Sequence, residues 1–146
     1  MVTTETGWGT GGAHPLTEVQ QGKLFLNLYL AQFKRGWRYT FIYEMRDYEG
    51  GDTDGTGIYH KDSTPKISAT YIHNFTTILA DTISKATGSL NYSIPSESAT
   101  VHDLLMQKSD GTFYLAVWDE RVLAVRALPL LVQISRIMHI TRPFDL

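Results

Sequence analysis

Apolar and polar residues along the chain follow patterns that predict a strand, a helix, a second strand and a second helix, in that order. The β-like residues Val2-Thr3-Thr4 run into a glycine-rich loop. Over residues 17–34, a Thr-x-x-Gln capping box precedes apolar residues at helical spacing, which predicts a helix. Trp37 to Tyr43 is a run of aromatic and β-branched residues typical of a mostly buried strand. The segment from Ser68 to about Ser84 places apolar residues three and four apart and predicts a second helix.

Such an alternation of strands and helices is typical of parallel βα units wound around a sheet. We therefore expect an α/β fold, with two βα units over residues 1–87 and further helices covering the sheet. Within the second unit, between its strand and its helix, residues 44–57 are acidic and rich in glycine, which predicts a loop.

The pattern changes at residue 88, where small polar residues and a proline are typical of a linker. Two β-rich runs follow at 100–107 and 112–118, and the Asp110-Gly111 pair between them is a strong hairpin signal. We expect residues 88–122 to be the start of a separate antiparallel domain. Residues 123–146 show neither strand nor helix periodicity, and this atypical tail stays unassigned.

Composition narrows the function classes. The chain has 146 residues, 42% of them apolar, and a formal net charge of -2, without a cluster of basic residues. This distribution argues against a nucleic acid or an anionic membrane as partner. The absence of cysteine excludes disulfides, thiolate catalysis and cysteine-based zinc sites. The most apolar stretch, 123–140, is interrupted by arginines, a proline and a glutamine, which argues against a membrane-spanning helix, and no signal peptide is recognisable after Met1.

Several short motifs, in order, resemble the C-terminal part of a clan A retaining glycoside hydrolase, a (β/α)-barrel enzyme. Thr3-Thr-Glu-Thr-Gly-Trp8 is similar to the end of the seventh barrel strand, and Tyr39-Thr-Phe-Ile-Tyr-Glu-Met-Arg-Asp47 to the eighth strand. The resemblance continues to about residue 122 through a lead into the eighth helix and the start of the accessory β-domain: Gly57-Ile-Tyr-His60, Asp62-Ser-Thr-Pro-Lys66, Ala69-Thr-Tyr71, Leu90-Asn-Tyr-Ser-Ile-Pro95 and Phe113-Tyr-Leu-Ala-Val-Trp-Asp-Glu120.

The resemblance implies a partial (β/α) TIM-barrel fragment, two βα units long, followed by a β-hairpin of an accessory β-sandwich. It implies that Glu5 is the catalytic nucleophile, acting on an oligosaccharide or polysaccharide by double displacement. Two carboxyl groups about 5 Å apart carry out that reaction. The family's acid/base, a glutamate in an Asn-Glu motif, has no counterpart here, since that dipeptide does not occur. We therefore expect an inactive isolated chain from an extracellular family, able to self-associate through exposed sheet edges.

Five further residues are candidates for contact with a substrate. Trp8 offers an apolar ring face near Glu5, and Glu44 ends the neighbouring strand, from which it could approach Glu5. Trp37, Tyr43 and His60 are candidates as pocket or sugar-stacking residues. Each has a plainer interpretation as a solvated loop residue or a core residue. That alternative stays open here for Glu5 as well.

The acidic loop also raises the question of a metal. Asp47, Glu49, Asp52 and Asp54 carry oxygen ligands suited to calcium, but their spacing differs from that of an EF-hand, and a solvated loop is favoured. Arg46 is placed to pair with Asp47 or Glu49. The histidines show no zinc spacing, so we expect neither a metal nor a cofactor.

Two other functions compete with the hydrolase interpretation. One is a non-catalytic carbohydrate-binding or interaction module that uses Trp8, Trp37 and Trp118 as stacking surfaces. The other is a gene fragment without function. A frameshift is our hypothesis for the tail from residue 123, because it does not continue the family pattern.

Overall fold

The computed structural model describes residues 1–13, 15–48, 55–84, 88–95, 98–120 and 133–137. Over these residues the chain is a mixed α/β protein with two helices and two small sheets, and no closed barrel is present among them. The elements are β1 (Val2–Thr3), α1 (Glu18–Lys34), β2 (Tyr39–Thr40), α2 (Ile67–Leu79), β3 (Val101–Gln107), β4 (Phe113–Asp119) and β5 (Gln133–Ile137). No helix among the described residues is long and apolar enough to cross a membrane.

Helix α1 has the bounds that the sequence predicts. The Thr17 hydroxyl accepts from the backbone N–H of Gln20, and the Gln20 side chain accepts from the backbone N–H of Thr17, so the capping box is complete. At the other end Gly36 has φ 73°, a left-handed conformation that a residue with a Cβ rarely adopts. Local chemistry thus sets both ends of this helix.

Helix α2 begins where expected but ends at Leu79 instead of continuing to about Ser84. Just past that end, the Asp81 carboxylate accepts hydrogen bonds from the backbone N–H of Ile83 and from the backbone N–H and hydroxyl of Ser109. The chain leaves the helical path here because Asp81 binds the turn between β3 and β4 instead of continuing the helix.

Strands β1 and β2 form a parallel pair in which Val2 lies opposite Tyr39 and Thr3 opposite Thr40. The expected strand over Trp37 to Tyr43 is therefore mostly wrong, although Phe41 still donates to the Thr3 carbonyl at 3.0 Å. It is not mostly buried either, since Tyr39 is 53% exposed. The physical reason is that α1 covers one face, where Thr3 and Thr40 both donate to the Gln32 side chain, and the opposite face has no covering layer among the described residues.

The hairpin is confirmed, with Val101 opposite Asp119, Gln107 opposite Phe113, and Gly111 at φ 87° in the turn. Strand β5 adds antiparallel to the other edge of β4. This strand lies in the tail that the sequence left unassigned, and Gln133–Ile137 therefore belongs to the same sheet as the hairpin. The remainder of the tail lies outside the described residues.

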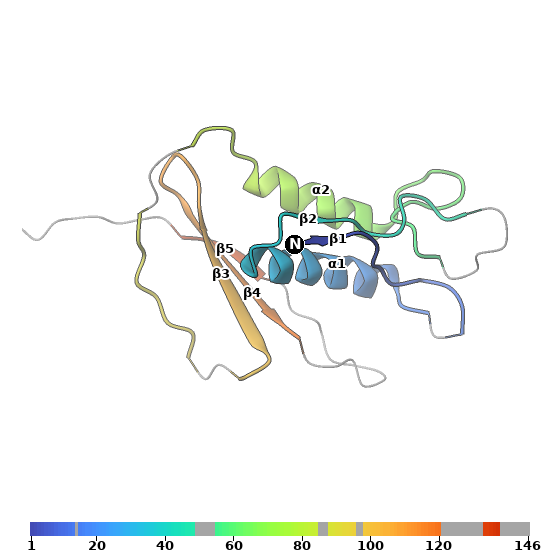
Figure 1. Cartoon of the computed structure of the whole chain (residues 1–146), viewed down its shortest axis with the longest axis horizontal. Coiled ribbons are helices and arrows are strands. Elements are labelled where there is room, and N and C mark those ends of the chain that lie inside the picture. Colours follow the sequence, from blue (N-terminus) through green and yellow to red (C-terminus); the bar gives the residue numbers. More distant parts are fainter. Residues whose placement is uncertain (14, 49–54, 85–87, 96–97, 121–132, 138–146) are drawn as a thin grey trace, which may run out of the picture.

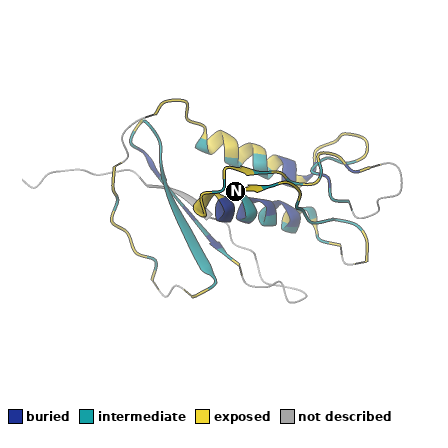
Figure 2. Cartoon of the chain, in the orientation of Figure 1, coloured by how far each residue is buried: buried dark blue, intermediate teal, exposed yellow. Residues whose placement is uncertain are grey.

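The hairpin and the helices share a core. Leu30 and Ala31 of α1 pack with Ala116 and Trp118 of β4, and Phe75 of α2 lies against this cluster. Figure 1 shows α1 and α2 side by side, with the β3–β4–β5 sheet crossing one end of the pair. Figure 2 shows buried residues on α1 and in the hairpin, and a largely exposed outer side of α2. The residues up to Leu79 and the hairpin are thus joined by packed apolar side chains.

Candidate functional site

Glu5 is separated from the end of β1 by Thr4, and it is exposed. The residues after it run against the end of β2, because the backbone N–H of Tyr43 donates to the Thr6 carbonyl at 2.7 Å. A Cβ built on Gly7 would lie 2.3 Å from the Tyr43 carbonyl oxygen, so only glycine fits there. The loop that carries Glu5 is consequently held against the C-terminal end of the neighbouring strand.

Tyr43 and Glu44 lie in the segment that follows β2, beyond Thr40, and are joined by a cis peptide bond. Tyr43 is 44% exposed, and Glu44 is partly buried with its carboxylate accepting from the Thr56 hydroxyl at 3.2 Å. Parallel strands place their carboxyl ends at the same edge, so the segments bearing Glu5, Tyr43 and Glu44 meet on one side of the small sheet. The structure brings these three candidates into one region.

Trp8 belongs to the same region but is only partly exposed. Its ring packs against Phe25 with centroids 5.9 Å apart, and its backbone carbonyl accepts from the Gln21 side chain at 2.7 Å. Phe25 is fully buried in α1. Trp8 therefore fixes the loop after Glu5 to the helix through both its ring and its backbone.

Among the described residues, the contacts of Trp37 and His60 are with other parts of the fold and not with the residues around Glu5. Trp37 precedes β2, at the opposite end of the strand from Tyr43, and it lines a cavity between the helices and the hairpin. His60 lies 3.1 Å from the Glu18 carboxylate at the start of α1. It lines a second hollow of about 610 Å³, together with Asp47, Lys61, Asp62 and Thr64. Hydrogen bonds from the side chain and backbone of Thr64 lower the pKa of Asp62 there.

A buried polar network, which we call the loop clamp, holds this end of the fold; it comprises Gln21, Asp47, Lys66 and Ser68. The Lys66 ammonium, 1% exposed, contacts both Asp47 oxygens at 2.9 Å, the Gly55 carbonyl at 2.8 Å and the Thr10 hydroxyl at 3.1 Å. Because a buried charge is costly unless it is paired and hydrogen-bonded, these contacts fix the position of Lys66 closely. The loops after β1 and β2 are therefore tied to the start of α2.

Gln21 forms the second half of the loop clamp and is fully buried. Its amide nitrogen donates to the Trp8 carbonyl, and its amide oxygen accepts from the Ser68 hydroxyl at 2.8 Å. The neighbouring Gly22 allows the helices to touch, since a Cβ there would lie 2.9 Å from the Tyr71 ring. The two helices and the loop carrying Trp8 thus meet at one buried amide.

Sequence reasoning missed Gln21, Lys66 and Ser68, because polar residues in or before a helix are usually solvated. A glycine in mid-helix, Gly22, was the available signal for a close approach. Of the two expected partners of Arg46, Glu49 lies outside the described residues, and Asp47 pairs with Lys66 instead. Arg46 donates to the Lys61 carbonyl at 3.1 Å. The ionic partner of Asp47 could not be read from spacing, because Lys66 belongs to a different element.

The remaining acidic-loop candidates, Glu49, Asp52 and Asp54, lie outside the described residues. Over the described part of the chain, no three histidine or carboxylate side chains gather in a way that could hold a metal ion. Asp47, the described member of the acidic run, is turned into the loop clamp, where it also accepts from the Gly57 backbone N–H at 2.8 Å.

The three tryptophans do not form a common stacking surface. Trp118 is 1% exposed, packed in the core beside His102, and has no face to offer a sugar. Trp8 and Trp37 lie at opposite ends of the β1–β2 pair. These positions weaken the interpretation as a carbohydrate-binding module that uses the three rings together.

Searches with the sequence find no matching protein-family model and no matching curated protein.

Proposed function

We propose that this chain is the C-terminal part of a retaining (β/α)-barrel glycoside hydrolase, that it contributes two βα units, and that Glu5 is the nucleophile. Its substrate is an oligosaccharide or polysaccharide of the kind met by an extracellular enzyme. The remaining strands and the acid/base glutamate come from outside these residues, so the isolated chain is inactive. The β3–β4 hairpin is part of the accessory β-sandwich in this proposal.

The observation that carries the proposal is the position of Glu5. It leaves the carboxyl end of one parallel strand and stands beside the carboxyl end of the next, where Tyr43 and Glu44 lie. Barrel enzymes place their catalytic groups at this end of their strands. Glu5 is exposed, and Trp8 and the loop clamp fix the loop that follows it. A fixed carboxylate supports the proposal because a nucleophile has to be held in position.

The chemistry follows from one carboxylate acting twice. An oxygen of Glu5 attacks the anomeric carbon and forms a glycosyl ester, while the glycosidic oxygen leaves with a proton from the acid/base residue. Water, deprotonated by that same residue, then attacks the anomeric carbon and releases the free carboxylate. In this proposal the sugar bound at Glu5 is contacted by Tyr43, Glu44 and Trp8. It is supported by the hydrogen bond that joins the segment after Glu5 to Tyr43.

Covalent labelling tests the proposal. The chain is joined in frame to the preceding βα units of a clan A enzyme that carry the Asn-Glu motif, and is exposed to a panel of 2-deoxy-2-fluoro glycosides. These reagents trap the glycosyl ester, so peptide mass mapping should find the sugar on Glu5.

Glu5→Gln should remove the label and Glu44→Gln should keep it, since only the first substitution deletes the attacking oxygen. Circular dichroism and a cooperative unfolding transition establish that each fusion is folded. A folded fusion that carries no label on Glu5 with any glycoside of the panel rejects the proposed function.

A further inference from the structure

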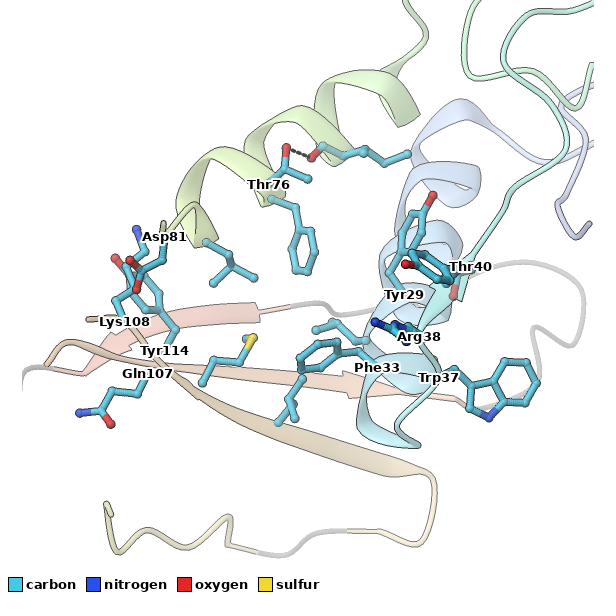
Figure 3. Close-up of a pocket in the computed structure, with 17 residues that line it drawn as sticks. Tyr29, Phe33, Trp37, Arg38, Thr40, Thr76, Asp81, Gln107, Lys108 and Tyr114 are labelled. Atoms are coloured by element: carbon cyan, nitrogen blue, oxygen red, sulfur yellow. Dashed lines mark hydrogen bonds between the residues drawn. The ribbon is translucent and has the colours of Figure 1, made fainter. Parts of the chain in front are cut away.

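A cavity of about 640 Å³ lies between α1, α2 and the β3–β4 hairpin (Figure 3), and Glu5 is not among the residues that line it. Its wall is mostly apolar and includes Phe33 from α1, Ile72, Phe75 and Leu79 from α2, and Met106 from β3. Binding sites for small organic molecules have volumes of roughly 300 to 1,000 Å³ and walls of this kind. The cavity therefore has the size and the lining of a ligand site.

Phe33 is the clearest sign that the wall is unfilled. It lines the cavity and is 66% exposed, although it stands on the best-packed helix of the fold. Tyr39, which also lines the cavity, is 53% exposed. Full burial of a large apolar side chain is favourable by roughly 1.5 to 3 kcal/mol. An apolar ligand that covers Phe33 therefore lowers the free energy of the complex.

Charge is distributed unequally between the two ends of the cavity. Figure 3 shows Lys108 beside Asp81 at one end, and the Asp81 carboxylate, held by Ser109, offsets the Lys108 charge there. At the other end Arg38 lies over the Tyr39 ring at 5.8 Å and forms no ion pair with any residue that the structure describes. The unbalanced charge is therefore positive and sits at the Arg38 end.

We propose that this cavity binds a small amphipathic anion, whose apolar chain or ring lies among Phe33, Phe75 and Met106 and whose carboxylate, or similar head, contacts Arg38. This function is separate from the glycosidase proposal, since neither the ligand nor its contacts involve Glu5. Arg38 is suited to the role because a guanidinium donates two parallel hydrogen bonds to a carboxylate.

Decanoate and 1-decanol, which share an apolar chain and differ in head charge, are the probes. Isothermal titration calorimetry of the full chain should give one decanoate per chain, bound more tightly than decanol. Arg38→Met should weaken decanoate about tenfold or more, the effect of losing a charge-assisted hydrogen bond, and leave decanol unchanged. Arg35→Met, on the neighbouring exposed arginine at the end of α1, is the matched control and should change neither affinity.

A second variant tests the location independently of charge. Thr76 of α2 is exposed and lines the cavity, so Thr76→Trp should fill the cavity and abolish binding of both probes.

Four results would overturn the proposal. They are the absence of saturable binding, uptake of many decanoate molecules per chain in the manner of an adventitious detergent, equal effects of Arg38→Met and Arg35→Met, and a dimer in sedimentation that excludes decanoate. The last would show that a second copy of the chain occupies the cavity instead.

Discussion

Where α1 begins, the chain is held by charged and amide side chains, whereas where α1 ends it is held by packed apolar ones. At the first end, Gln21 and Lys66 are buried and every interaction has a direction and a partner. At the second, Leu30 and Trp118 are as deeply buried but contact their neighbours through apolar surface. The polar end carries Glu5 and Glu44, and the apolar end carries the cavity.

The difference teaches how each end limits motion. Hydrogen bonds to a buried charge specify one arrangement of the loops, because any shift leaves the charge without a partner. Apolar packing specifies volume more than direction. A reaction that depends on carboxylate placement is better served by the first kind of end, and a cavity for an apolar ligand by the second.

The largest expected effect comes from breaking the loop clamp. Lys66→Met leaves Asp47 buried without its counter-ion, which should lower the free energy of unfolding by about 3–5 kcal/mol. Urea denaturation followed by circular dichroism measures the loss. Lys61→Met, on an exposed lysine in the same loop, should change stability by less than about 0.5 kcal/mol. Equal midpoints for the two variants would mean that the loop clamp carries no stability.

Leu30→Ala should destabilise the apolar end of the fold. Leu30 is 1% exposed and packs with Trp118, so its truncation should cost about 3 kcal/mol through lost burial and the cavity it leaves. Thermal unfolding of this variant is compared with that of Phe33→Ala on the same helix, where high exposure predicts a change near 0.5 kcal/mol. If Phe33→Ala were the more damaging, the assignment of the core to Leu30 would be incorrect.

A smaller loss is expected when the buried amide is removed. Gln21→Leu leaves the Trp8 carbonyl and the Ser68 hydroxyl without this hydrogen-bond partner, which should lower the free energy of unfolding by about 2 kcal/mol. Ser68→Ala alone should lower it by about 1 kcal/mol. Because the two side chains contact each other, the double variant should lose less than the sum. Strict additivity in chemical denaturation would show that Gln21 and Ser68 do not interact in solution.

The smallest effect concerns the junction of α1 with β3. Asp103 has its pKa lowered first by the Tyr92 hydroxyl and then by Lys34, whose ammonium lies 3.1 Å away. A lowered folded-state pKa adds stability above the unfolded value, near 3.9, and this stability is lost as the pH falls through the folded pKa. The difference in melting temperature between the wild type and Asp103→Asn should therefore shrink between about pH 6 and about pH 3. A constant difference would contradict the assigned shift.

Local sequence signals predicted the elements whose ends are set by local chemistry. Thr17 and Gln20 marked the start of α1, and Gly111 marked the hairpin turn. The second strand was overestimated because Phe41 and Tyr43 have high β propensity, yet the segment beyond Thr40 pairs only through scattered hydrogen bonds. Strand β5 had no periodic pattern, and its pairing with β4 is a property of the sheet.

At the candidate site, sequence reasoning located the ends of the strands better than it located partners. Glu44 was expected to be able to approach Glu5 from the neighbouring strand, and the segments that carry Glu5, Tyr43 and Glu44 follow the same edge of the parallel pair. Trp37 was grouped with them because a tryptophan is a common sugar contact, but it precedes its strand and so lies at the other end. The loop clamp depends on contacts between distant segments, as from Thr10 to Lys66, and no spacing rule encodes these.

Because the Lys66 ammonium is buried, its chemical reactivity reports how often this part of the fold opens locally. An amine-reactive reagent can modify it only during moments when the loops open, whereas exposed Lys61 reacts at all times. The ratio of the two labelling rates, followed by mass spectrometry, therefore yields the equilibrium constant for opening at this end of the protein without any substitution. A compound that binds near Glu5 and reduces opening of these loops would slow the labelling of Lys66 and leave the labelling rate of Lys61 unchanged.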